Sequence, residues 1–159
     1  MNENEQEIEV KFYVNDLAAV EESLLGLGCR LVEPKVFESN LRFDTPDGAL
    51  TLERRVLRLR QPAPSGQPEA AGVLTYKSPA QPGQEVTIRQ EIEVVVDNLV
   101  TARHLLEALG YQVVVMYEKW RTIYRLGPVD VVLDELPYGN FVEIEGHNPE
   151  EIRTAARQL

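Results

Sequence analysis

The sequence predicts an α+β domain in which about eight antiparallel strands close into a barrel, a tunnel with a charged interior, and about three helices pack outside. Charged and apolar side chains alternate along many segments of the 159-residue chain, which is typical of strands with one polar and one apolar face. Three other segments begin at a capping residue and carry apolar residues at helical spacing. A chain of this length can bury a sizeable core, so we expect one domain over residues 1–159.

Each expected strand is an apolar or alternating run that ends at a turn signal. DTPDG at 44–48, SPAQPG at 78–83 and LPYGN at 136–140 are such signals. The segment QPAPSGQPEAAG, residues 61–72, is expected to be a loop. The strands are expected at about 5–14, 29–44, 50–60, 73–78, 85–97, 111–126, 129–135 and 140–146.

The three expected helices have recognisable ends. The first follows Asp16 and stops at Gly28, and the second follows Asn98 and stops at Gly110. The third begins after Asn148, with a proline in its first position. The sequence ends in TAARQL without a C-cap, so we expect that the extreme C-terminal part of the domain is missing.

The tripeptide Glu-Ile-Glu occurs three times, at residues 7–9, 91–93 and 143–145. Each copy leads towards an expected helix, so the chain contains an internal repeat. Because strand side chains alternate between faces, the glutamates share one face and the isoleucines share the other. We expect Ile8, Ile92 and Ile144 to face helices outside the barrel, with the glutamates pointing inward.

The same alternation collects charges of both signs on the glutamate face. A solvated sheet face is the simplest explanation for any one strand. For the whole set, the near balance of acids and bases in a chain of net charge −10 favours an enclosed face, where charges must compensate each other. The acids are Glu7, Glu9, Glu91, Glu93, Asp134, Glu143 and Glu145, and the bases are Lys11, Arg58, Arg60, Lys77, Lys119 and Arg121.

These two sets suit two kinds of ligand. Fixed arginine and lysine side chains match a polyanion with several phosphates. Clustered carboxylates without histidine or cysteine nearby match hard cations such as Mg²⁺ or Mn²⁺. The sequence therefore predicts a metal–polyphosphate site that holds phosphates with side chains, since it contains no Walker-type glycine-rich loop.

Composition excludes other classes. The acidic balance argues against a nucleic-acid partner, whose phosphates need a basic surface. No apolar run approaches the roughly 20 residues of a membrane helix, so we expect no membrane partner. The single cysteine, Cys29, and a polar, acidic N-terminus without a secretory signal favour a cytoplasmic location.

An ordered series of motifs resembles the CYTH superfamily, the triphosphate tunnel metalloenzymes. EIEVK at 7–11 is similar to the family's N-terminal ExExK signature. RFDTPDGAL, LRLR, LTYK, RQEIEV, EKWR and LDELPYGNFVEIEG follow in the family's order, so the resemblance spans residues 5 to about 147.

This resemblance implies a triphosphate bound inside an eight-stranded tunnel, with one or two Mg²⁺ or Mn²⁺ ions. It implies that the six bases hold the phosphates and that the seven acids place the metal, Glu7, Glu9 and Glu145 first among them. The catalytic residues it implies are Glu7, Glu9, Lys11 and Glu145. Bases and a first metal would neutralise the phosphates, and a second metal or a carboxylate base would orient the nucleophile.

Three functions fit these residues. The first is a metal-dependent hydrolase of inorganic triphosphate, thiamine triphosphate or a nucleoside triphosphate. The second is a class IV-type adenylyl cyclase that forms cyclic AMP and pyrophosphate, and the third is a non-catalytic polyphosphate- or nucleotide-binding module. The intact set of carboxylates favours an enzyme with a small-molecule triphosphate substrate, and the resemblance also makes a homodimer possible.

Overall fold

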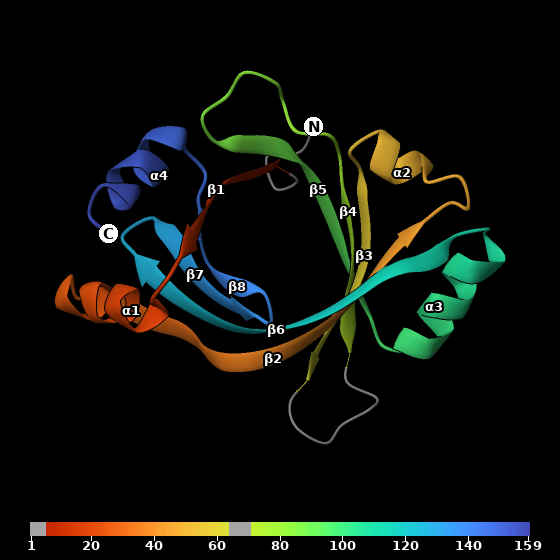
Figure 1. Ribbon diagram of the computed structural model, residues 1–159, viewed down its shortest axis with the longest axis horizontal. Coiled ribbons are helices and arrows are strands. Elements are labelled where there is room, and N and C mark those ends of the chain that lie inside the picture. The colour runs from red at the N-terminus through yellow and green to blue at the C-terminus, as the bar shows by residue number, and fades with distance from the viewer. Residues whose placement is uncertain (1–5, 64–70) are drawn as a thin grey trace. The chain divides into compact units, whose positions relative to one another are not determined.

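The computed structural model describes residues 6–63 and 71–159, which form eight strands and four helices (Figure 1). The strands are β1 (Gln6–Val14), β2 (Arg30–Asp44), β3 (Val56–Ala63), β4 (Gly72–Lys77), β5 (Thr87–Val96), β6 (Gln112–Leu126), β7 (Val129–Leu136) and β8 (Gly139–Glu145). The helices are α1 (Leu17–Gly26), α2 (Ala49–Leu52), α3 (Leu99–Ala108) and α4 (Pro149–Ala156). None of the helices in these residues has the length and apolar character needed to cross a membrane.

The strands are hydrogen-bonded in the order β1-β5-β4-β3-β2-β6-β7-β8, and the sheet closes into a barrel. The neighbouring strands run antiparallel, as the pairs β1–β8, β2–β3 and β6–β7 illustrate. This confirms the closed eight-stranded antiparallel barrel that the sequence predicts.

The chain divides into two compact units, which are described separately below. Among the described residues, the first unit contains those of Phe37–Ala80 and Arg89–Glu118. The second unit contains Gln6–Val36, Gln81–Ile88 and Lys119–Leu159.

The second unit has a hydrophobic core between its strands and the helices α1 and α4, which lie beside β1, β7 and β8 in Figure 1. Ile8 and Ile144 contribute to it from two of the Glu-Ile-Glu segments and are 6% and 1% exposed. Leu24 of α1 and Ile152 of α4 are fully buried against them. Each such side chain stabilises the fold by about 1.5–3 kcal/mol. The apolar face of these strands therefore packs on helices, as predicted.

The first unit has a smaller core made of Phe43, Leu59 and Leu106, with partly buried residues around it. Leu106 comes from α3, so this helix covers the apolar side of β3. The third isoleucine of the repeat, Ile92, differs from its counterparts because it is 43% exposed. The expectation that a helix covers it is wrong.

Two boundaries predicted from the sequence are also wrong. Residues 50–55 were expected to begin the third strand, but α2 and the turn after it occupy them. Gly48, with a φ of 72°, turns the chain into α2. The expected loop at 61–72 is shorter, because β3 continues to Ala63 and β4 begins at Gly72. The rest of that predicted loop lies mainly outside the described residues.

Asp44 explains why a short helix forms where a strand is expected. Its carboxylate accepts hydrogen bonds from the backbone N–H groups of Thr45, Leu50 and Thr51 and from the Thr51 hydroxyl, at 2.6–3.0 Å. Burial alone would raise the pKa of Asp44, but these four donors outweigh it and lower the pKa to about 2. The carboxylate thus organises the whole β2–α2 connection.

We predict that Asp44→Ala lowers the free energy of unfolding by about 2–3 kcal/mol, because buried donors lose a charged acceptor. Urea denaturation at pH 7 measures this loss. The pKa of Asp44 is below its ordinary value of 3.8, so its contribution is present above pH 3.8 and disappears as the pH falls towards 2. The matched control, Glu53→Ala, removes an exposed carboxylate from the same segment and should change stability by less than about 1 kcal/mol. Equal effects of the two variants would contradict the role of Asp44.

Candidate functional site

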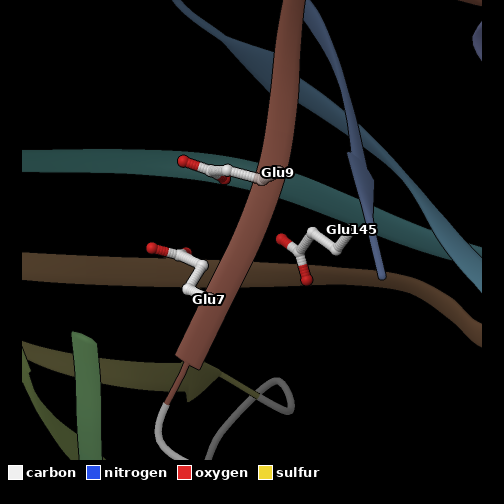
Figure 2. Close-up of side chains that lie close together, drawn as sticks. All are labelled: Glu7, Glu9 and Glu145. Carbon is white, nitrogen blue, oxygen red and sulfur yellow. The ribbon is translucent and has the colours of Figure 1, made fainter. Parts of the chain in front are cut away.

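Three glutamates of the second unit form an acidic cluster. Glu7 and Glu9 lie two residues apart on β1, and Glu145 on β8 is the register partner of Glu9 (Figure 2). One carboxylate oxygen from each residue lies within 4.8 Å of the others. Glu9 is buried, whereas Glu7 and Glu145 are half-buried. The repeated Glu-Ile-Glu pattern and the β1–β8 register together bring these side chains to one place.

The environment of the cluster disfavours negative charge. Burial is the largest cause that raises the pKa of Glu145 to about 7, and the carboxylates of Glu143, Glu9 and Glu7 add to it, while Arg121 opposes it. Its ordinary pKa is 4.5, so ionising Glu145 destabilises the ligand-free fold increasingly as the pH rises from 4.5 to 7. A bound cation would remove this cost.

The cluster fits a divalent metal. Its three donors are carboxylate oxygens, which Mg²⁺ and Mn²⁺ prefer. A cavity of about 210 Å³ borders Glu7 and Glu145, and Asp130 and His147 also line it. This leaves room beside the carboxylates for a cation with part of its hydration shell.

A network of ion pairs lies next to the cluster on the same face of the strands. Asp134 on β7 is fully buried and accepts hydrogen bonds from Lys119 at 2.7 Å and from Arg121 at 2.7 and 2.8 Å. Arg121 also donates to Glu143 at 2.6 Å, and Glu143 accepts from Lys11 at 2.6 Å. These contacts link three bases and two acids directly beside the acidic cluster.

The network fixes the charge of its members. Burial alone would raise the pKa of Glu143, but Arg121, Lys11 and Lys119 outweigh it and lower the pKa to about 2. Burial works against the ammonium of Lys11, yet Glu143 and further acids raise the pKa of Lys11 overall. Lys11 and Glu143 therefore stay ionised at neutral pH.

The first unit carries the other predicted bases on strands β3 and β4. Arg60 lies 3.5 Å from Glu93 and 3.8 Å from Glu38, and Arg58 lies 3.9 Å from Glu93. These three distances are longer than those of a charge-assisted hydrogen bond. Lys77 pairs with its register partner Glu91 at 3.1 Å.

The structure thus divides the seven predicted metal ligands into two groups. Glu7, Glu9 and Glu145 form the only set of three or more possible ligands found among the described residues. The others lie against lysine or arginine side chains, and Glu93 also accepts a hydrogen bond from Thr75 at 2.7 Å. These four are Glu91, Glu93, Asp134 and Glu143.

Sequence reasoning missed three polar residues on the same face of the first unit. Glu38 is 4% exposed, and Asn40 and Thr75 are fully buried. Asn40 is the register partner of Arg60, and neither polar atom of its side chain has a hydrogen-bond partner within the described part of the chain. The sequence ESNLR, residues 38–42, contained the information needed to predict Glu38 and Asn40. Residues two apart in a strand share a face, so these two lie on the same side as Arg42.

Comparisons with known proteins show what this chain is similar to. A family model for the CYTH domain matches residues 5–159. The adenylate cyclase CyaB of Aeromonas hydrophila is 30% identical over 139 residues, which cover 87% of this chain and 67% of that protein. The structure of PH1012 from Pyrococcus horikoshii OT3 is 29% identical, with a TM-score of 0.77 and coverage of 96% of this chain and 88% of that one.

A further structure shares the fold at lower identity. HpAC1 from Hippeastrum is 23% identical, with a TM-score of 0.74, and the similarity covers 95% of this chain and 84% of that chain. HpAC1 is described as a proposed adenylyl cyclase with a dominant triphosphatase activity.

We predict that the cluster binds Mn²⁺ more tightly at high pH. The metal competes with the proton of Glu145, whose pKa is about 7. Affinity should therefore rise about tenfold between pH 6 and pH 8. Calorimetric titration with Mn²⁺ measures this slope. Glu145→Gln should bind more weakly and lose the slope, and an equal slope in both proteins would contradict the role of Glu145.

We also predict that Asn40→Leu stabilises the ligand-free protein by about 1–2 kcal/mol, because it removes buried polar atoms without partners while keeping a branched shape. Urea denaturation measures the change. The matched control is Asn98→Leu, which removes the N-cap of α3 that accepts from the Thr101 N–H at 2.9 Å. That variant should lose about 1 kcal/mol. A comparable loss in Asn40→Leu would show that Asn40 has partners in solution.

Proposed function

Because the chain belongs to the CYTH domain family, we propose that it is a divalent-metal-dependent enzyme that binds a triphosphate and hydrolyses it. The observation that carries this proposal is the acidic cluster of Glu7, Glu9 and Glu145 directly beside a network of lysine and arginine side chains. The triphosphatase activity described for HpAC1, which shares the fold, supports hydrolysis.

In this proposal the metal is Mg²⁺ or Mn²⁺, and it is held by the acidic cluster. When bound there, the ion supplies positive charge to the phosphate oxygens and to the charge that develops during transfer. The four other acids have a different role. Their contacts with Lys11, Lys77, Lys119 and the arginines hold these bases in place.

The bases bind the phosphates. Lys11 and Arg121 already exchange hydrogen bonds with carboxylates at 2.6–2.8 Å, and phosphate oxygens are stronger polyanionic acceptors of the same kind. Arg58 and Arg60 lie 3.9 and 3.5 Å from Glu93, and their planar guanidinium groups can bind phosphate oxygens bidentately. These side chains stabilise the negative charge of the transition state by electrostatic preorganisation.

The proposed reaction uses water as the nucleophile. Water attacks the terminal phosphorus, the bond to the bridging oxygen breaks, and its electron pair leaves with the diphosphate. The products are orthophosphate and a diphosphate, and the proton of water passes to solvent. The charged face stabilises the phosphates in this reaction without any need for a covalent intermediate.

A second candidate is cyclisation of ATP, which the 30% identity to the adenylate cyclase CyaB favours. There the ribose 3′-hydroxyl would attack the α-phosphorus, with release of pyrophosphate. The bases and the acidic cluster would have the same roles. The two candidates differ in which phosphorus lies next to the nucleophile.

One assay separates the candidates. The protein is incubated with Mg²⁺ or Mn²⁺ and with inorganic triphosphate, thiamine triphosphate or ATP, and orthophosphate, pyrophosphate and cyclic AMP are measured. We expect orthophosphate without cyclic AMP, and its loss when the metal is chelated. Cyclic AMP with pyrophosphate would establish the cyclase instead. Tight binding without turnover would leave a non-catalytic binding module.

We predict that Glu9→Gln lowers kcat by about 10²-fold or more, because the buried carboxylate loses its charge towards the metal. Orthophosphate release from the best substrate of the panel measures this. The matched control is Glu22→Gln, an exposed glutamate of α1 that should retain activity. Full activity in Glu9→Gln would rule out the proposed cluster.

A further inference from the structure

Three aromatic side chains lie at one end of the charged face in the second unit. Tyr13 comes from β1, Phe141 from β8, and Tyr138 from the turn between β7 and β8. The Tyr13 and Phe141 rings are 5.7 Å apart at 79°, and the Tyr138 and Phe141 rings are 6.2 Å apart at 66°. Both are edge-to-face contacts, which aromatic pairs favour. We call these three residues the aromatic platform.

The platform is built locally and left open. Tyr13 is 63% exposed and Tyr138 is 70% exposed, although both rings make edge-to-face contacts with Phe141. Gly139 has a φ of 152°, and a Cβ at this position would lie 2.7 Å from Cε2 of Tyr13. A side chain at position 139 would therefore displace the Tyr13 ring from this backbone. The absence of a Cβ thus lets the Tyr13 ring lie against the β7–β8 turn.

The platform continues the proposed site along two strands. On β1 the same face carries Glu7, Glu9, Lys11 and then Tyr13, since residues two apart share a face. On β8 the register partners Phe141, Glu143 and Glu145 repeat this order in the opposite direction. Lys11 joins the two parts, with its Nζ 2.6 Å from Glu143 and 4.9 Å from the centre of the Phe141 ring.

We propose that the aromatic platform binds the flat heteroaromatic group of an organic triphosphate whose phosphates are held at Lys11. Tyr13 lies two residues beyond Lys11, roughly 6.5–7 Å along the strand, within reach of a group tethered to the phosphates. Heterocycles stack on exposed aromatic rings with little dependence on their identity. This inference rests on the proposed function and narrows its substrate class. It favours a nucleoside triphosphate or thiamine triphosphate over inorganic triphosphate.

The test compares substrates with and without the organic group. We expect Tyr13→Ala and Tyr138→Ala to raise KM for ATP or thiamine triphosphate roughly 5- to 100-fold, the range of a lost stacking contact. KM for inorganic triphosphate should stay within about twofold, because this substrate has no ring to stack. Tyr13→Phe keeps the ring and should retain the wild-type KM. Comparing ATP with thiamine triphosphate identifies the heterocycle.

The matched control is Phe12→Ala, which removes a 42% exposed ring next to Tyr13 on the other face of β1 and should not discriminate between substrates. Equal effects of Tyr13→Ala on organic and inorganic triphosphates would overturn the platform while leaving the proposed hydrolysis intact.

Calorimetric binding of a non-hydrolysable ATP analogue gives a second readout that needs no turnover. If wild type hydrolyses nothing, the proposed function fails, but a selective loss of analogue binding in Tyr13→Ala still supports the platform. If neither the analogue nor thiamine triphosphate binds wild type, the platform is wrong.

Discussion

Asp134 is the fixed point of the charged face in the second unit. Its carboxylate is fully buried and is held by Lys119 and Arg121 from the neighbouring strand β6. Removing one partner of such a buried pair costs about 3–5 kcal/mol, because the other charge is left without compensation. Arg121 reaches on to Glu143, and Glu143 holds Lys11, so one chain of contacts links β6, β7, β8 and β1. The positions of Lys11, Lys119 and Arg121, which we propose bind phosphate, therefore depend on Asp134.

The same network explains why neighbouring glutamates behave differently. Glu143 and Glu145 are two residues apart on one face of β8, yet the pKa of Glu143 is lowered to about 2 and that of Glu145 is raised to about 7. Both are shielded from water, but Glu143 faces three bases while Glu145 faces Glu7 and Glu9 as well as Arg121. The charge of Glu143 is compensated by neighbouring bases, whereas the charge of Glu145 is disfavoured by neighbouring carboxylates. This difference is the physical reason for assigning the metal to the acidic cluster.

The sequence predicted the barrel because alternation along each strand is a local property. It could not separate the three acids proposed as metal ligands from the acids that pair with bases, since that separation depends on which residues face each other across strands. The strand register makes this distinction, because it places Glu9 opposite Glu145 and Lys11 opposite Glu143. A local sequence pattern does not reveal that register. Helix α2 was missed because its origin is the contact of Asp44 with Leu50 and Thr51, six and seven residues away. Asn40 was not predicted because its side chain carries no charge, although it lies in the same alternation as Glu38 and Arg42.

The polar face tolerates destabilising features because the opposite face of the same strands is tightly packed. Ile8 and Ile144 are buried beside glutamates whose mutual repulsion disfavours the ligand-free fold. In the first unit, Leu59 is 2% exposed and lies between Arg58 and Arg60 in the chain. The packed, helix-facing side therefore stabilises the fold. The polar side can then keep crowded carboxylates whose repulsion is not compensated in the ligand-free protein. A triphosphate with a bound metal ion, the ligand proposed for this chain, would add anionic oxygens beside the bases and a cation beside the crowded glutamates.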